Sequence, residues 1–432
     1  MPPVRLKDFA RTEDGAITIL AVYLLAATLL ASAFAVEFAY LQSARTQLQV
    51  AADSAAHAAL YNRETMGPEE AKARAAAVAL HDMPPAAYGA VLTAENVEFG
   101  VWDAAARSFV SDPTAVSAVR VRPSRTGAGG NPVKTYIFRL LDHGDWDIAA
   151  EAVFTTFQPP CLREGFVADG IVDIQSNNGF SNGFCVHSNT YVSLNSNNTF
   201  EPGTVVSMPD LSQLDLPKSG FETNEGLQIA LRRGYYRLRV LNKIDAIHDD
   251  LLTGYGHYVP DYLRGVTVYL TGSKFTAEDF TPNRIHRISC SGTKVTIEQD
   301  SHLKNLGIIT DCPVAFGQGV LLENVVVFNE STDAKSFTAP SGLSVGLDDG
   351  CAPGGGAQLI TRGGVDVAAD LRVYGGQIIA LGDITFSANA NGIQGASLIS
   401  GQEISGTSNM DMGFCGTGME GNYEAPYFRL AL

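Results

Sequence analysis

The feature that most constrains this chain is an uncharged apolar run close to its N-terminus. From Ala16 to Val36 there are 21 residues with no charge, no proline and no glycine. Because an α-helix rises about 1.5 Å per residue, such a run crosses the roughly 30 Å hydrocarbon core of a bilayer. The sequence therefore predicts a transmembrane helix over residues 16–36, preceded by a short mixed-charge tail over residues 1–15.

The helix is predicted to continue beyond the membrane over residues 37–62, because this segment holds no helix breaker. Apolar and small residues recur there at spacings of three and four, which places them on one face. Small residues allow close approach of a second helix. We expect this face to pack against helices of other membrane proteins, through Tyr40, Ala44, Leu48, Ala51, Ala52 and Ala55. We expect Glu37, Arg45 and Asp53 to orient the helix at the membrane interface rather than to do chemistry.

Four short segments carry a family resemblance: Asp14–Ile17, Glu37–Leu41, Arg45–Gln49 and Ala51–Ala56. With the apolar span between the first two, they resemble the N-terminal signature of the Tad/Flp (tight-adherence) pilus-assembly proteins, in the TadG-like branch. The resemblance implies a membrane-anchored, mostly periplasmic component of a pilus machine in a bacterial inner membrane. It also implies that the partners are other pilus-assembly membrane proteins.

Two kinds of processing compete with a retained anchor. Ala31-Ser32-Ala33 is a tripeptide of the type that signal peptidase cleaves, but the apolar run exceeds the 7–15 residues of a signal peptide core. A pilin-type leader would end at Gly15. Pilins that resemble this segment carry Glu five residues after that glycine, where this chain has Leu20. We therefore expect the mature protein to keep its anchor.

Charge sets the expected topology and excludes one class of partner. The formal net charge is −16 and no Lys/Arg-rich run occurs, so nucleic acid is not an expected partner. Arg5, Lys7 and Arg11 precede the span, whereas Arg45 alone lies in the comparable stretch after it. The positive-inside bias thus predicts a single-pass protein with a cytoplasmic N-terminus and its bulk in the periplasm.

All six cysteines lie after Gln158, as expected for disulfides in an oxidising compartment. Six reduced core cysteines are the alternative, and no Cys/His spacing fits a zinc site. Six cysteines allow fifteen pairings. We expect neighbours in sequence to pair: Cys161 with Cys185, Cys290 with Cys312, and Cys351 with Cys415.

The rest of the chain divides at Pro159-Pro160. Residues 63–158 mix an Ala-rich helix with alternating strands, which predicts a small α+β domain. Residues 161–432 hold many short apolar strands bounded by Gly, Asn, Asp or Ser, with a helical insertion predicted at residues 222–253. This pattern favours a mainly-β domain resembling a right-handed parallel β-helix, with asparagines at its corners; a β-sandwich is the alternative.

The sequence offers no catalytic motif, so we expect a non-enzymatic component of pilus assembly, involved in adhesion, without cofactor, metal site or small-molecule substrate. The alternative is an envelope-anchored β-helix that binds or cleaves polysaccharide. Its best carboxylate pairs are Asp348 with Asp349, and Asp169 with Asp173. Adjacent acids before a glycine are more often an ordinary turn.

Overall fold

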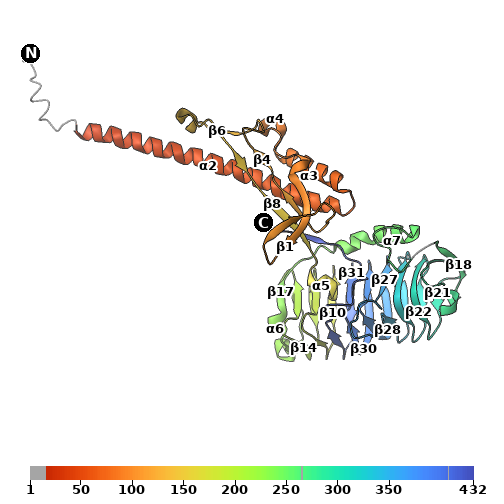
Figure 1. The fold of residues 1–432 in the computed structure, drawn as a ribbon. Coiled ribbons are helices and arrows are strands. Elements are labelled where there is room, and N and C mark those ends of the chain that lie inside the picture. The colour runs from red at the N-terminus through yellow and green to blue at the C-terminus, as the bar shows by residue number, and fades with distance from the viewer. Residues whose placement is uncertain (1–15, 264–265, 407) are drawn as a thin grey trace, which may run out of the picture. The chain divides into compact units, whose positions relative to one another are not determined.

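The computed structural model describes residues 16–432, except 264–265, 407 and the side chains of 16, 141, 290 and 388–391. The chain forms two compact units, coloured by position along the chain in Figure 1. The first comprises the residues up to Phe157 together with Tyr427–Leu432. The second comprises Gln158–Pro426.

One helix, α2 (Ala16–Arg63), combines the predicted membrane span and its extension. A turn follows, and α3 (Pro68–Asp82) begins with proline in its first turn and with Glu69 and Glu70 beside the positive end of the helix dipole. A short helix, α4 (Pro85–Tyr88), leads into the sheet.

The sheet of the first unit is antiparallel, in the order β2-β1-β3-β8-β34. Its strands are β1 (Val97–Asp103), β2 (Ser108–Ser111), β3 (Ala118–Val121), β8 (Ala152–Phe157) and β34 (Tyr427–Leu430). Two short ribbons pair β4 (Ser124–Arg125) with β7 (Ile148–Ala149), and β5 (Val133–Lys134) with β6 (Asp145–Trp146). The sequence analysis places the C-terminal residues in the domain at 161–432. In the structure the last strand belongs to the first unit instead, because β34 hydrogen-bonds to β8.

The core of this unit lies where α2 and α3 cover the sheet. Ala51, Ala55 and Ala59 of α2 are fully buried, as are the alanines of α3 at positions 71, 75 and 79. Alanine on both helices permits a close approach of their backbones. Phe99 of β1 and Val119 of β3 complete the core from the sheet side.

The second unit is a stack of parallel strands, and 25 strands belong to it in the described residues. They are β9 (Gly165–Ala168), β10 (Val172–Ile174), β11 (Gly179–Phe180), β12 (Cys185–Ser188), β13 (Val192–Leu194), β14 (Asn198–Phe200), β15 (Val205–Met208), β16 (Asn224–Glu225), β17 (Leu231–Arg233), β18 (Val268–Gly272), β19 (Lys274–Phe275), β20 (Ile285–Cys290), β21 (Val295–Ile297), β22 (His302–Thr310), β23 (Val314–Phe316), β24 (Leu321–Asn329), β25 (Phe337–Ala339), β26 (Ser344–Val345), β27 (Ala357–Thr361), β28 (Val365–Tyr374), β29 (Gln377–Ala380), β30 (Ile384–Gln394), β31 (Ser397–Ser400), β32 (Ile404–Gly406) and β33 (Asp411–Gly413).

The order of the stack differs from the order of the chain. From β9 the strands add outward in one direction, β9 to β12, β15 and β17. The chain then crosses to the far end, where β18 pairs with β20, and returns strand by strand until β31 pairs with the other edge of β9 (Figure 1). The crossing carries α7 (Ile244–Thr253), which Gly254 ends in a left-handed conformation.

The insertion predicted at 222–253 is therefore only partly helical. Glu222–Arg233 does not form one helix: a 3₁₀ turn (Gly220–Thr223), β16, the short helix α6 (Leu227–Ala230) and β17 share this segment. Strand pairing explains the difference, because β16 and β17 extend the stack on β14 and β15. Tertiary pairing here outweighs the local helix propensity.

Asparagines shape the turns of the stack, as the sequence predicts. Asn177 and Asn197 have left-handed backbones with φ of 62° and 64°. Inside the stack, the Asn178 side chain donates to Asn198 Oδ1 at 2.9 Å, and Asn198 donates to Asn224 Oδ1 at 3.2 Å. This ladder satisfies buried polar groups along neighbouring parallel strands.

Two of the three expected disulfides are present. Cys161 in the short helix α5 (Pro160–Arg163) bonds to Cys185 in β12, and Cys351 bonds to Cys415. The third expected pair involves Cys290, whose side chain lies outside the described residues.

A buried histidine gives the second unit a defined pH dependence. The ring of His187 lies 2.7 Å from Ser207 Oγ and 2.8 Å from Asn189 Oδ1, and burial lowers its pKa. Below pH about 6.5 the unfolded chain therefore binds a proton that the folded state still excludes. We expect the free energy of unfolding to fall on acidification from pH 7.5 to 5.5.

A His187→Gln variant should lose part of that slope in urea titrations followed at several pH values. His286, whose pKa burial also lowers, should still make its own contribution of the same sign in this variant. Identical slopes for the variant and the unmodified protein would contradict this assignment.

Candidate functional site at the membrane anchor

The N-terminal half of α2 presents apolar side chains to its surroundings along its whole length. Ile17 is 79% exposed, Leu24 58% and Val36 66%. The apolar stretch of this helix is long enough to cross a membrane, and none of it is buried. By length and composition, α2 is a candidate membrane span.

Glu37 marks the point at which the helix passes from exposed to packed. Its side chain is only 2% exposed. Its two carboxylate oxygens accept hydrogen bonds from the backbone N–H groups of Tyr136 and Ile137, at 2.9 and 2.7 Å. Charge-assisted hydrogen bonds of this kind satisfy a carboxylate that burial would otherwise destabilise. Glu37 thus attaches the segment between β5 and β6 to the helix.

Aromatic side chains surround the helix at the same level. We call Phe34, Phe38, Tyr40, Tyr136, Phe138 and Trp146 the aromatic collar. The rings of Phe34 and Phe138 lie 5.6 Å apart, those of Tyr40 and Tyr136 5.5 Å apart, and Trp146 lies 5.8 Å from Phe138. Tyrosine and tryptophan are the residues enriched at membrane–water interfaces. The collar therefore suits the end of a membrane span.

The predicted packing stripe is buried inside its own unit. Ala44 is 5% exposed, and Leu48, Ala51, Ala52 and Ala55 are fully buried. The extension of α2 packs on α3, β3 and β8 of this chain. Tyr40, at 36% exposure, belongs to the collar. A separate helix would therefore meet the exposed half of α2 rather than this stripe.

The other two predicted orienting residues have different surroundings. Arg45 is exposed and lines a groove of about 460 Å³ beside Phe38 and Trp146. Asp53 accepts a hydrogen bond at 2.9 Å from Gln49 Nε2, which also donates to the Glu151 carbonyl at 2.9 Å. Asp53 therefore helps to fix α2 to the chain that enters β8.

Sequence reasoning missed the segment from Tyr136 to Trp146 as part of this site. Nothing local connects it with Glu37, which precedes it by about a hundred residues. Its aromatic residues, Tyr136, Phe138 and Trp146, were the signal that the sequence offered.

Replacing Glu37 by alanine should release this segment. The N–H groups of Tyr136 and Ile137 would lose their acceptor, at a cost of about 1–3 kcal/mol for a buried unsatisfied group. We expect faster hydrogen exchange in peptides covering residues 133–148. Gln47→Ala, an exposed position on the same helix, serves as the control and should change nothing. Equal exchange in both variants would show that Glu37 does not hold the segment.

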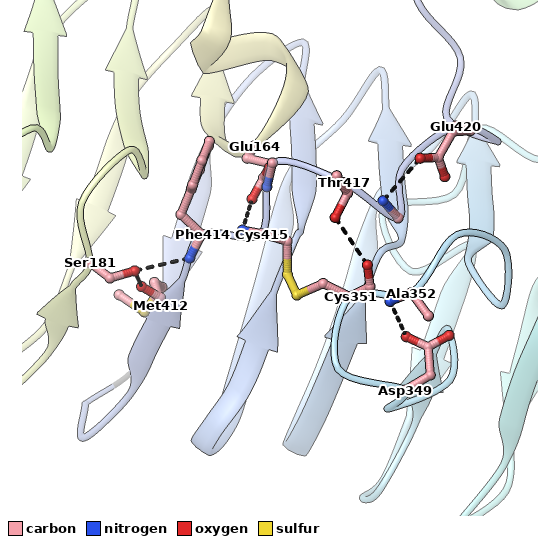
Figure 2. Close-up of a disulfide and its surroundings, with 12 residues drawn as sticks. Glu164, Ser181, Asp349, Cys351, Ala352, Met412, Phe414, Cys415, Thr417 and Glu420 are labelled. Atoms are coloured by element: carbon pink, nitrogen blue, oxygen red, sulfur yellow. Dashed lines mark hydrogen bonds between the residues drawn. A yellow bond between two sulfur atoms is a disulfide. The ribbon is translucent and has the colours of Figure 1, made fainter.

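Three of the four carboxylates considered for polysaccharide cleavage, those of Asp349, Asp169 and Asp173, are engaged locally. Asp349 accepts from the backbone of Ala352 at 2.9 Å within a turn, which Figure 2 shows. Asp169 accepts from Asn189 Nδ2 at 2.8 Å, and Asp173 accepts from Gln175 Nε2 at 3.1 Å. Within the described part of the chain, no group of three or more His, Cys, Asp or Glu side chains could hold a metal ion.

Comparison with family models gives two matches. Residues 165–416 match a domain of unknown function, DUF7867, which covers more than half of the chain. Residues 15–79 match the family described as putative Flp pilus-assembly TadE/G-like, which confirms the resemblance seen at the N-terminus. No curated protein and no solved structure matches the chain.

Proposed function

Since the chain belongs to the DUF7867 family and its N-terminal segment is TadE/G-like, we propose that it is a membrane-anchored, non-enzymatic component of a Tad/Flp-type pilus machine. One observation carries the proposal: a single helix, α2, is exposed and apolar over residues 17–36, within the family-matched segment 15–79, and then becomes the core helix of a folded unit. The same helix therefore links the exposed apolar stretch to the folded part of the first unit without a break.

We assign the bulk of the protein to the periplasm, with the N-terminus in the cytoplasm. The distribution of Arg and Lys around the span supports this orientation. The disulfides Cys161–Cys185 and Cys351–Cys415 support it as well, because such bonds persist in an oxidising compartment.

In the membrane, the exposed half of α2 is the surface that would contact other pilus-assembly proteins. The division of the helix supports a pseudopilin-like role: the outer half is buried in its own unit, and the exposed membrane half is available to a partner. A contribution to adhesion would then come through the assembled pilus.

We further propose that the second unit winds as a parallel β-helix. Successive parallel registers support this, since Val172 pairs with Val192 and Ile384 with Ile404, each twenty residues further along the chain. The buried asparagine ladder and the stacked rings of Phe180 and Phe200, 4.7 Å apart, are typical of repeated coils.

Deleting the gene and counting pili by electron microscopy tests the proposed function. We expect few or no pili in the deletion strain and restored pili on complementation. Complementation with a Leu24→Arg, Leu25→Arg variant should fail, because two charges at the middle of the span oppose membrane insertion. Normal piliation of the deletion strain would overturn the proposal.

A further inference from the structure

The second unit contains a pocket that the proposed function does not use. It has a volume of about 610 Å³, within the range of small-molecule sites. One side is formed by residues 257–262, which follow α7, and the other by the glycine-rich residues 416–424. We call it the loop pocket.

The glycine-rich side is held on the stack by buried polar side chains. Gln377 of β29, 1% exposed, accepts a hydrogen bond from the Tyr423 N–H at 2.8 Å and donates to the Tyr423 carbonyl at 3.1 Å. Gln358, its register partner on β27, donates to Asn422 Oδ1 at 3.3 Å. The stack therefore fixes Asn422 and Tyr423 in place.

A disulfide secures the start of the same segment. Figure 2 shows Cys415 bonded to Cys351, with its backbone N–H donating to Glu164 at 2.7 Å. Thr417 then donates from its hydroxyl to the Cys351 carbonyl at 3.1 Å. These contacts make this side of the pocket a built structure rather than a loose loop.

The opposite side is ordered by the end of α7. Asp250 Oδ2 accepts from the Tyr258 N–H at 2.9 Å, which folds the chain back after Gly254. The ring of Tyr258 lies 5.0 Å from that of His257 and 6.1 Å from that of Tyr423. Aromatic rings from both segments thus lie close together at the pocket wall.

Three buried polar atoms of residues that line this pocket have no hydrogen-bond partner among the described residues. They are the hydroxyls of Tyr262 and Tyr423 and the side-chain nitrogen of Asn422. Tyr423 is only 6% exposed. Burial raises the pKa of both tyrosine hydroxyls, so both keep their protons and act as neutral donors. A buried polar group without a partner costs about 1–3 kcal/mol, and three at one place indicate a ligand that supplies the partners.

We propose that the loop pocket binds a neutral saccharide. Hydroxyl groups on a sugar can both accept from and donate to Tyr262, Tyr423 and Asn422. The apolar faces of sugar rings suit the aromatic lining, as tyrosine combines an apolar ring with a polar end. An anionic ligand fits less well, because the guanidinium of Arg163 in the lining already faces Glu424, at 3.7 Å.

The test uses the full-length protein in detergent and isothermal titration calorimetry. The probes are maltotriose, cellotriose and triacetylchitotriose. We expect the unmodified protein to bind at least one of them. The Tyr262→Phe, Tyr423→Phe double variant should bind that trisaccharide at least tenfold more weakly, because it keeps both rings and loses both donors.

Stability measurements separate binding from folding. Since neither hydroxyl has a partner within the described chain, the double variant should melt at the same temperature as the unmodified protein or higher. Tyr255→Phe, at a position that is 76% exposed, is the matched control and should leave both binding and melting unchanged. The proposal fails if none of the three trisaccharides binds, if the double variant binds equally well, or if its melting temperature falls.

Discussion

A chain carrying Ala51→Trp and Ala55→Trp is expected to lose the packing of α3 on α2. Both alanines are fully buried in the core between α2, α3 and the sheet. Overpacking a core costs about 1–3 kcal/mol for each extra side chain, occasionally more, and indole is far larger than a methyl group. The combined cost is comparable with the total stability of a small folded unit.

Hydrogen exchange followed by mass spectrometry checks this result in peptides covering α3, residues 68–82. Those peptides should exchange much faster in the double variant. Val50→Trp is the matched control, because Val50 lies on the same helix but is 54% exposed, so its substitution should be nearly neutral. Unchanged protection of α3 in the double variant would mean that the helix does not pack as described. The same variant should also fail to restore pili in a deletion strain.

Replacing Cys351 and Cys415 by serine is expected to destabilise the second unit by about 4 kcal/mol, from the loop entropy released in the unfolded chain. The bond joins residues 64 positions apart. The corresponding Cys161→Ser, Cys185→Ser variant removes a bond over 24 positions and should cost less, about 3 kcal/mol.

Denaturant unfolding of both variants, followed by circular dichroism, measures the two losses. The informative result is the order of the denaturant concentrations at which half of the protein is unfolded. We expect the highest value for the unmodified protein, the next for the Cys161/Cys185 variant and the lowest for the Cys351/Cys415 variant. A smaller loss for the longer loop would mean that local packing, rather than chain entropy, determines the contribution of these bonds.

Several features of the fold could be predicted from the sequence because they depend on local composition. The charge-free run predicts the exposed half of α2, and the spacing of three and four predicts which of its residues are buried. The sequential pairings Cys161–Cys185 and Cys351–Cys415 are confirmed. For the first pair the reason is visible in the register, because Cys185 of β12 lies beside Gly165 of β9, close to Cys161 in sequence.

Other features depend on contacts between distant segments, and no local pattern encodes them. β34 pairs with β8, although the whole second unit separates the two strands in the sequence. In the same way β31 pairs with β9, although the strands β10 to β30 lie between them in the chain. The partners of Glu37 are backbone groups, which carry no residue identity to recognise. The prediction of a helical insertion at residues 222–253 was wrong over Glu222–Arg233 for the same reason. Residues of this segment form β16 and β17, which pair with the distant strands β14 and β15.

The central claim is that one helix anchors the protein and that everything after Val36 lies outside the cytoplasm. Single cysteines introduced at Thr12 and at Ser108, an exposed residue of β2, test it directly with a membrane-impermeant maleimide on spheroplasts. The account predicts that Ser108→Cys is labelled on intact spheroplasts and that Thr12→Cys is labelled only after lysis. Labelling of Thr12→Cys on intact spheroplasts, with Ser108→Cys protected until lysis, would contradict it.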